Sequence, residues 1–183
     1  MKKITTPEFR VSYANVFEPA KFEGQPSKYG VTMLFPKTAD ISGLKKLAAA
    51  AVAEKWPAKE QRPKGLRSPF RDGDTEKQDT QGYEGMIFIR ANSKQKPGVV
   101  DRQRNMIVDD SEFYSGCYAR ATLTAYAYDT KGNRGVAFGL QNIQKLRDGE
   151  PFSGRTNAED DFDVYEDDSD GAFDTTADDD FLG

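Results

Sequence analysis

Residues 117–128 alternate between small apolar side chains and larger polar or aromatic ones. One set of alternate positions is Cys117, Ala119, Ala121, Leu123, Ala125 and Ala127, and the other is Tyr118, Arg120, Thr122, Thr124, Tyr126 and Tyr128. Successive side chains of a β-strand point to opposite faces of the sheet. The period of two therefore predicts a strand with a small apolar face against a core and a polar, aromatic face turned away from it.

Four further segments have strand character, namely residues 9–17, 29–35, 86–93 and 134–146. In the first of them we expect Phe9, Val11 and Tyr13 on one face. The last two strands flank residues 129–133, which are rich in residue types that tolerate a positive φ, as a hairpin turn requires. The chain is therefore expected to be mainly β.

One helix is expected over residues 42–56, between the second and third strands. Its apolar positions fall at helical spacing, Asp40 or Ser42 can cap its start, and Pro57 ends it. Residues 59–84 and 94–112 are polar and rich in turn residues, so we expect two long surface loops. Five strands, one helix and long loops fit most economically into a small barrel.

The C-terminal stretch from residue 158 to 183 contains twelve acidic residues and no lysine or arginine. The whole chain has 26 basic and 30 acidic residues, so residues 1–157 carry a net charge of about +8. We expect residues 1–157 to form one domain and residues 158–183 to be a disordered acidic tail. A basic domain joined to its own polyanion indicates a surface for polyanions that the tail can occupy when the ligand is absent.

Several classes of protein are disfavoured by composition. The chain has one cysteine and no histidine, which excludes internal disulfides and most zinc sites, and no metal or other cofactor is expected. No uncharged run is long enough to span a bilayer, and residues 1–7 lack the apolar core of a secretion signal. We expect a soluble protein of a reducing cytoplasm that does not bind membranes.

The polar face of strand 117–128 is the strongest candidate for a binding surface. Tyrosines can stack on bases, and arginine and threonine can bind phosphates. If Ile87, Ile89 and Ala91 face the core, the neighbouring strand turns Phe88, Arg90 and Asn92 toward the same ligand. The two long loops add cations and one aromatic ring, Phe70, which either covers a bound base or fixes its loop to the barrel. The predicted DNA-binding set is Tyr118, Arg120, Tyr126, Tyr128, Phe88, Arg90, Arg67, Phe70, Arg71, Lys94, Lys96, Arg102 and Arg104.

Two other functions are compatible with the sequence. The acidic tail suits a protein-interaction module or a DNA mimic, whose barrel would not bind DNA. Asp109, Asp110 and Glu112, with Glu84, suit the magnesium site of a nuclease. Adjacent acids in loops are usually solvated turn residues, and no histidine base or nucleophile motif accompanies them, so catalysis is not expected.

Residues 114–120 and 131–144 carry a resemblance to a known family. The chain resembles the single-stranded DNA-binding proteins of tailed bacteriophages from about residue 9 to residue 146, and its acidic tail is of the same type. The resemblance implies an OB-fold that coats single strands during replication, recombination or repair in the cytoplasm of a bacterial host. It also implies that the tail recruits replication or recombination proteins, through Asp178, Asp179, Asp180 and Phe181. The chain departs from the family pattern by ending on Leu182 and Gly183 after that phenylalanine. A homodimer through an exposed strand edge is compatible with the sequence.

Overall fold

The computed structural model describes residues 2–21, 23–24, 26–152 and 162–165. The described part is mainly β, as expected from the sequence, and its strands form one eight-stranded sheet. None of the helices in these ranges is long and apolar enough to cross a membrane. The long strands are β2 (Phe9–Ala20), β3 (Lys28–Pro36), β5 (Met86–Ser93), β7 (Tyr118–Thr130) and β8 (Asn133–Arg147), and the short ones are β1 (Ile4–Thr5), β4 (Arg71–Asp72) and β6 (Gly98–Val100).

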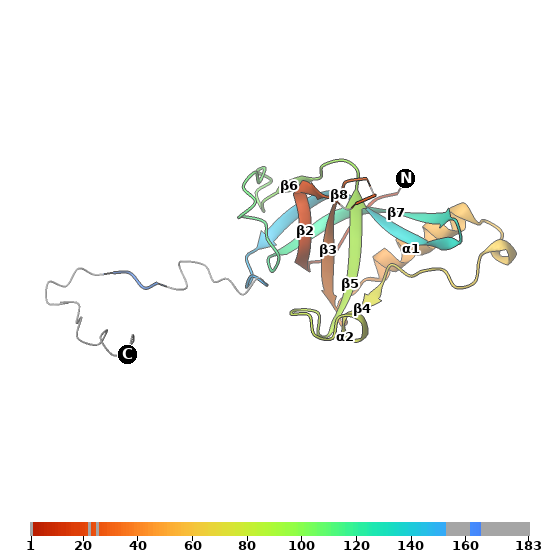
Figure 1. Ribbon diagram of the computed structural model, residues 1–183, viewed down its shortest axis with the longest axis horizontal. Coiled ribbons are helices and arrows are strands. Elements are labelled where there is room, and N and C mark those ends of the chain that lie inside the picture. The colour runs from red at the N-terminus through yellow and green to blue at the C-terminus, as the bar shows by residue number, and fades with distance from the viewer. Residues whose placement is uncertain (1, 22, 25, 153–161, 166–183) are drawn as a thin grey trace.

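The five long strands pair into a closed ring. β2 is antiparallel to both β3 and β7, and β3 is antiparallel to β5. β5 then pairs in parallel with β8, and β8 forms the long hairpin with β7. Figure 1 shows β2, β3 and β5 side by side, with the β7–β8 hairpin extending toward helix α1 (Ser42–Lys55). The sheet therefore encloses a core and leaves an outer surface on every strand of the ring.

The core confirms the buried apolar face only over residues 117–125, since Ala127 is merely half-buried and Thr124, on the predicted polar face, is buried as well. Cys117, Ala119 and Leu123 are fully buried, and Ala121 and Ala125 are nearly so. Helix α1 lies against β7 and covers this part of the core with Leu44, Leu47, Ala48 and Ala51. The predicted helix is thus confirmed, and it ends at Lys55, one residue before the predicted end.

Neither Asp40 nor Ser42 caps the helix as expected, because its N-cap residue is Ile41 and no side-chain capping hydrogen bond is made. The Asp40 Oδ1 atom instead accepts a hydrogen bond from the backbone N–H of Ser42, the first helical residue, at 3.0 Å. Hydrogen bonds from Ser42 hold the pKa of the Asp40 carboxyl below its ordinary value, which is the usual effect of a donor on a carboxylate.

The expected alternation of β2 is wrong beyond Val11. Phe9 and Val11 are buried, but Tyr13 is exposed and Ser12 is buried in its place. The pairing of β2 with β3 shifts between Ser12 and Asn15, and Tyr13 has φ 45°. A β-bulge reverses which side chains face the core, and no period-two pattern in the sequence can reveal it.

The two expected loops contain short elements that the sequence did not predict. Residues 59–84 include a 3₁₀ helix (Lys59–Gln61), strand β4 and helix α2 (Gly73–Glu76), and residues 94–112 include β6. β4 pairs with β5, and β6 pairs with β8. Strands of two or three residues are too short to show periodicity and form because a neighbouring strand offers free backbone groups.

Candidate nucleic-acid interface

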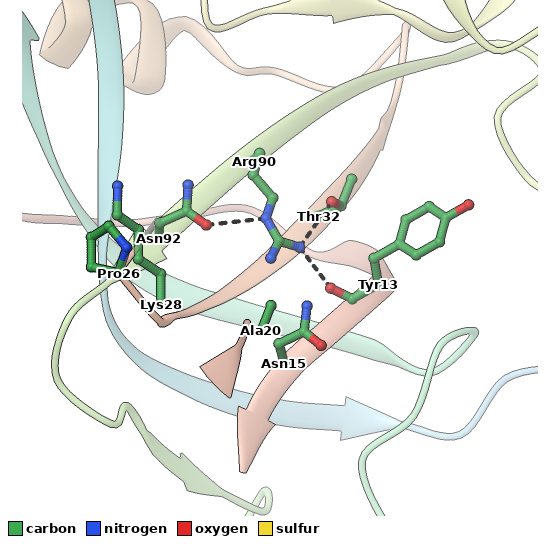
Figure 2. Close-up of a pocket in the computed structure, with 8 residues that line it drawn as sticks. All are labelled: Tyr13, Asn15, Ala20, Pro26, Lys28, Thr32, Arg90 and Asn92. Atoms are coloured by element: carbon green, nitrogen blue, oxygen red, sulfur yellow. Dashed lines mark hydrogen bonds between the residues drawn. The ribbon is translucent and has the colours of Figure 1, made fainter. Parts of the chain in front are cut away.

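A groove crosses the outer face of β2, β3 and β5. It has a volume of about 440 Å³ and is lined by Tyr13, Asn15, Ala20, Pro26, Lys28, Thr32, Arg90 and Asn92. Figure 2 shows these residues around Arg90; all come from the three strands except Pro26, which lies between β2 and β3. Two of the lining residues are cationic and none is acidic, so this groove favours an anionic ligand.

Arg90 is the most firmly held cation of the groove. Its Nη1 atom donates to the Tyr13 carbonyl oxygen at 2.7 Å and to Thr32 Oγ1 at 3.3 Å, and its Nε atom donates to Asn92 Oδ1 at 3.1 Å. Burial lowers the pKa of the Arg90 guanidinium, but an arginine still remains charged at neutral pH. The guanidinium therefore presents a fixed positive charge at the bottom of the groove (Figure 2).

Gly30 makes room for this arrangement. A Cβ atom at Gly30 would lie 2.4 Å from Asn92 Oδ1, 2.6 Å from Arg90 Nη2 and 2.9 Å from the Ala91 carbonyl oxygen. Such distances are far inside van der Waals contact. A glycine is needed here because the groove side chains lie directly over the β3 backbone.

Tyr13 stands between this groove and a second hollow. The second hollow has a volume of about 450 Å³ and is lined by Ser12, Tyr13, Asp79, Thr80, Gln81, Tyr83, Ser115 and Phe152. The side chain of Tyr13 is 57% exposed, and its ring points away from Arg90 in Figure 2. A non-glycine residue at positive φ is uncommon and often marks a functional position. Tyr13 is the candidate stacking residue that the sequence analysis missed, because a simple alternation places it in the core.

The outer face near the second hollow is covered by residues 71–86. Tyr83 is 1% exposed and packs edge to face on Phe88 with ring centroids 5.2 Å apart. The Tyr83 hydroxyl lies 2.8 Å from Ser12 Oγ, directly beside the bulge. Burial raises the pKa of Tyr83. Residues 71–86 therefore cover Leu34 and Phe88 and also contribute to the lining of the second hollow.

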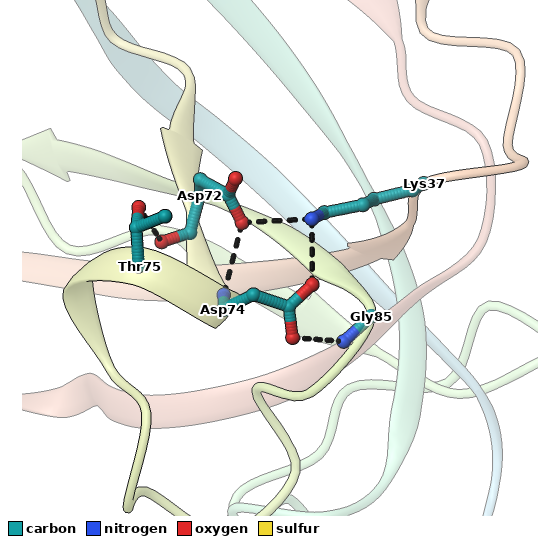
Figure 3. A network of polar contacts seen from close by, with 5 residues as sticks. All are labelled: Lys37, Asp72, Asp74, Thr75 and Gly85. Atoms are coloured by element: carbon teal, nitrogen blue, oxygen red, sulfur yellow. Dashed lines mark hydrogen bonds and ion pairs between the residues drawn. The ribbon is translucent and has the colours of Figure 1, made fainter.

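An ion cluster fixes the start of this segment, as Figure 3 shows. Lys37 Nζ lies 2.9 Å from Asp72 Oδ1 and 2.6 Å from Asp74 Oδ2. Asp74 Oδ1 also accepts a hydrogen bond from the Gly85 backbone N–H at 2.9 Å, which joins the two ends of the segment. The hydrogen bonds from Lys37 lower the pKa of both carboxyls, and the two carboxylates raise the pKa of Lys37.

The structure corrects the predicted role of Phe88 and shows how Arg71 is held. Phe88 is 5% exposed beneath Tyr83, so it is not available to stack on a base. Arg71 lies over the Phe88 ring at 5.2 Å and forms an ion pair with Glu76 at 2.7 Å. The sequence prediction failed for Phe88 because the strand is covered on both faces, the outer one by residues that were expected to form a surface loop.

Tyr118, Arg120, Tyr126 and Tyr128 do not form one compact site. The last of them lies ten positions after the first, which corresponds to roughly 33 Å along a strand. The guanidinium groups of Arg147 and Arg10 both lie over the ring of Tyr118, at 3.8 Å and 5.7 Å from its centroid. Tyr126 is 43% exposed beside the end of α1, and Tyr128 lies opposite Gly135 near Arg67.

The remaining predicted residues are divided among the loops. Phe70 packs edge to face on the core residue Phe138 with centroids 5.8 Å apart, which favours fixation of its loop to the ring over covering a base. Arg67 bridges to Gly135 through its backbone, and its side chain is exposed. Lys94 and Lys96 are exposed between β5 and β6, and Arg102 and Arg104 are exposed after β6.

The candidate acidic cluster of a nuclease is not assembled in the described part of the chain. Asp109 accepts hydrogen bonds from the backbone N–H and the hydroxyl of Ser111, and these bonds lower its pKa. No group of three potential metal ligands is found in the described ranges. Asp178, Asp179, Asp180 and Phe181, and the expected boundary between residues 157 and 158, lie outside the described residues.

A protein family and a phage protein match most of the chain in sequence. Residues 2–173 match the family described as Enterobacter phage Enc34, ssDNA-binding protein. Protein p50 of Acyrthosiphon pisum secondary endosymbiont phage 1 is 34% identical over 165 residues, which cover 83% of this chain and 87% of that protein.

Two solved structures are also similar. The single-stranded DNA-binding protein from bacteriophage Enc34, solved in complex with ssDNA, matches with a TM-score of 0.70 and 26% identity, over 82% of this chain and 89% of that one. The single-stranded DNA-binding protein gp2.5 of bacteriophage T7 shares the fold, with a TM-score of 0.56 and 15% identity, over 86% of this chain and 98% of that one.

Proposed function

Because the chain belongs to the single-stranded DNA-binding protein family of Enterobacter phage Enc34, we propose that it binds single-stranded DNA itself. Binding is non-enzymatic and largely independent of base sequence. The observation that carries this proposal is the groove on β2, β3 and β5, where a fixed guanidinium and an exposed tyrosine lie side by side. We assign the ring of strands to the OB-fold, whose sheet face binds oligonucleotides in other proteins.

The groove has one side for phosphates and another for bases. Arg90 and Lys28 supply positive charge in the groove on β2, β3 and β5, which has no acidic lining residue. Asp79 lines the second hollow beyond Tyr13, and its carboxylate repels phosphate. The DNA backbone therefore follows Arg90 and Lys28, and a base stacks on Tyr13. Stacking is tolerant of sequence because every base has an aromatic face.

The exposed cations around the groove extend the electrostatic surface. Lys94 and Lys96 follow directly after β5, so they add positive charge beyond Asn92 to that supplied by Arg90 on the same strand. Arg67 and Tyr128 lie together near the hairpin end of β7 and β8 and form a further contact for a longer strand. The expected salt dependence is a slope of roughly −0.7 in log affinity against log salt for each phosphate neutralised.

The acidic tail, residues 158–183, competes with DNA for this surface. It carries twelve negative charges, and the rest of the chain has a net charge of about +8. Phe152, which precedes the tail in the sequence, lines the second hollow, and its backbone N–H donates to the Ser115 carbonyl oxygen at 3.1 Å. DNA binding releases the tail, whose Asp178, Asp179, Asp180 and Phe181 then recruit other proteins.

The cellular role follows from these properties. The protein coats single strands during phage DNA replication, recombination or repair in the host cytoplasm, and its tail brings replication or recombination proteins to the coated strand. A homodimer is compatible with this role.

Fluorescence anisotropy with labelled single-stranded DNA, double-stranded DNA and RNA tests the proposal. The full chain and a variant lacking residues 158–183 are titrated at two salt concentrations in the presence of EDTA. We expect salt-sensitive preference for single strands and tighter binding by the shortened variant. Absence of binding by both proteins would reject the proposal and favour a protein-interaction module or DNA mimic. Weaker binding after removal of the tail would reject the competition alone.

A further inference from the structure

A separate hollow lies on another part of the ring, over β7, β8 and β6. Its volume is about 390 Å³, and its polar lining includes Arg104, Arg120, Thr122, Asn142 and Gln144. It shares no lining residue with the groove on β2, β3 and β5, and none of its lining residues is acidic. Its size falls in the range of roughly 300–1,000 Å³ that is usual for small-ligand sites.

Gln144 organises the two arginines of this hollow. Its Oε1 atom accepts a hydrogen bond from Arg120 Nε at 2.8 Å. Its Nε2 atom donates to the carbonyl oxygens of Asp101 and Arg102 at 3.2 and 3.3 Å. Gln144 thus orients Arg120 on β7 and also holds the loop that carries Arg104. The Nη atoms of Arg120 have no hydrogen-bond partner within the described residues.

The loop that carries Arg104 is a tight, internally bonded turn. The Arg104 backbone N–H donates to the Asp101 carbonyl oxygen at 3.1 Å, and the Asp101 carboxylate accepts from the backbone of Gln103 and Asn105, both at 2.9 Å. Arg104 has φ 69°, in the left-handed region. Such a turn holds the start of the Arg104 side chain in a defined position, so less entropy is lost when its guanidinium binds a ligand.

The other polar groups of the hollow are left as donors. Asn142 Oδ1 already accepts from the Gly98 backbone N–H at 3.0 Å, so its amide nitrogen is available. Thr122 Oγ1 accepts from the Asn142 backbone N–H at 3.1 Å and keeps its own hydrogen to donate. Val100 is only partly buried and adds apolar surface beside these donors, whereas Ile143 is 1% exposed and faces the core. Two guanidinium groups, further donors and the apolar surface of Val100 match a nucleotide, with its phosphate oxygens, base edge and flat ring.

We propose that this hollow, defined by Arg104, Arg120, Asn142 and Gln144, is a second contact site for single-stranded DNA. It takes a nucleotide of a strand whose other part occupies the groove of the same molecule or of a neighbouring one. The inference rests on the proposed function, because it assumes that the groove on β2, β3 and β5 binds the strand first. The proposal also gives a role to Arg120, which lies on the polar face of β7 and does not line the groove on β2, β3 and β5.

The test compares the full chain with the double variant Arg104→Gln and Arg120→Gln. The charge-matched control is the double variant Lys59→Gln and Lys64→Gln, whose two exposed lysines line neither hollow nor groove. The groove variant is Tyr13→Ala. Each protein is titrated with oligothymidylates of about 5 and about 20 nucleotides, near the lower limit and beyond the upper limit of the span covered by one OB-fold. Circular dichroism confirms folding of each variant.

We expect the arginine variant to lose roughly tenfold in affinity for the long oligonucleotide, with little change for the short one. Its salt slope for the long oligonucleotide should fall by about 1.4, which corresponds to two phosphate contacts. The lysine control should show smaller changes than the arginine variant in both the affinity and the salt slope for the long oligonucleotide. Tyr13→Ala should weaken binding of both lengths.

Three results would overturn the second site. An arginine variant that behaves like the lysine control shows that only net charge matters. Equal losses for both lengths place these arginines in the primary site. Tighter DNA binding by the arginine variant shows that the hollow holds the acidic tail instead of DNA. In each case, weakened binding by Tyr13→Ala keeps the proposed function intact, whereas failure of the unmodified chain to bind either oligonucleotide rejects the proposed function itself.

Discussion

The hydroxyl of Tyr83 lies 2.8 Å from Ser12 Oγ in a fully buried contact between residues 71 positions apart. Ser12 immediately precedes Tyr13, the residue at φ 45° that projects into the candidate interface. This contact joins residues 71–86, which cover the outer face of the sheet, to the bulge in β2. The outward position of Tyr13 therefore depends on the side chain of Tyr83, from a distant part of the chain.

Replacing Tyr83 by phenylalanine should destabilise the protein by about 1–2 kcal/mol, because the buried Ser12 hydroxyl loses its partner. The double variant with Ser12→Ala should lose less unfolding free energy than the sum of the losses of the two single variants, since the partners of one hydrogen bond are not independent. Urea unfolding of the two single variants and the double variant measures this coupling. Additive losses would mean that the contact contributes no interaction energy.

Removal of the Tyr13 ring should weaken binding of single-stranded DNA by about 1–3 kcal/mol, the usual contribution of one stacked base. Tyr13→Phe should retain most of the affinity, because the ring is kept. Tyr126→Ala is the matched control, since Tyr126 is also an exposed tyrosine on a strand but lies beside α1 and outside the groove. A larger loss for Tyr126→Ala than for Tyr13→Ala would place the interface on β7, as the sequence alone predicts.

The Lys37 cluster should contribute stability only in a defined pH range. The folded pKa values of Asp72 and Asp74 are lowered below the ordinary value of 3.8, so their contribution is present above about pH 4 and disappears as the pH falls through the lowered values. The pKa of Lys37 is raised above 10.5, so its contribution disappears as the pH rises beyond that value.

Lys37→Met should therefore lower the melting temperature at neutral pH and have progressively less effect toward pH 2. Lys45→Met, which replaces an exposed lysine without a described ion pair, serves as the control for the loss of charge. Thermal unfolding followed by circular dichroism across the pH range measures the difference between the two variants. An equal difference at pH 2 and pH 7 would show that packing of the lysine chain, and not the ion cluster, accounts for the effect.

The only cysteine, Cys117, should be inert in the folded protein. It is fully buried, and burial raises the pKa of its thiol to about 11, so the reactive thiolate is scarce at pH 8. We expect a maleimide reagent to label the native protein very slowly and the urea-unfolded protein at once. Rapid stoichiometric labelling under native conditions would mean that the β7 end of the core opens readily.

Much of the fold could be predicted where the sequence has a clear period. The buried face from Cys117 to Ala125 and the apolar side of α1 follow from alternation and from helical spacing, because burial imposes those periods directly. The acidic composition of residues 158–183 is equally plain in the sequence, and the polyanion-binding surface that it predicts on residues 1–157 stays a prediction.

The sites could be predicted only in part. Arg90 lies in the groove, as its position in β5 indicated, whereas Phe88 on the same face is buried because residues 71–86 return to cover it. Arg120 faces a hollow that also receives Arg104 from a loop, a pairing that depends on Gln144 from the neighbouring strand. Alternation specifies the face of a strand but not what lies over that face.

The sequence alone predicts the strand periodicity, the helix that begins at Ser42, the excess of positive charge in residues 1–157 and the acidic stretch that follows them. These properties depend on the residue types and their spacing along the chain. The outward orientation of Tyr13 and the division of the predicted binding residues between separate surfaces arise only in the folded chain. They depend on a bulge, a two-residue strand and the covering residues 71–86, which are stabilised by contacts between residues distant in the sequence and therefore leave no periodic signal in it.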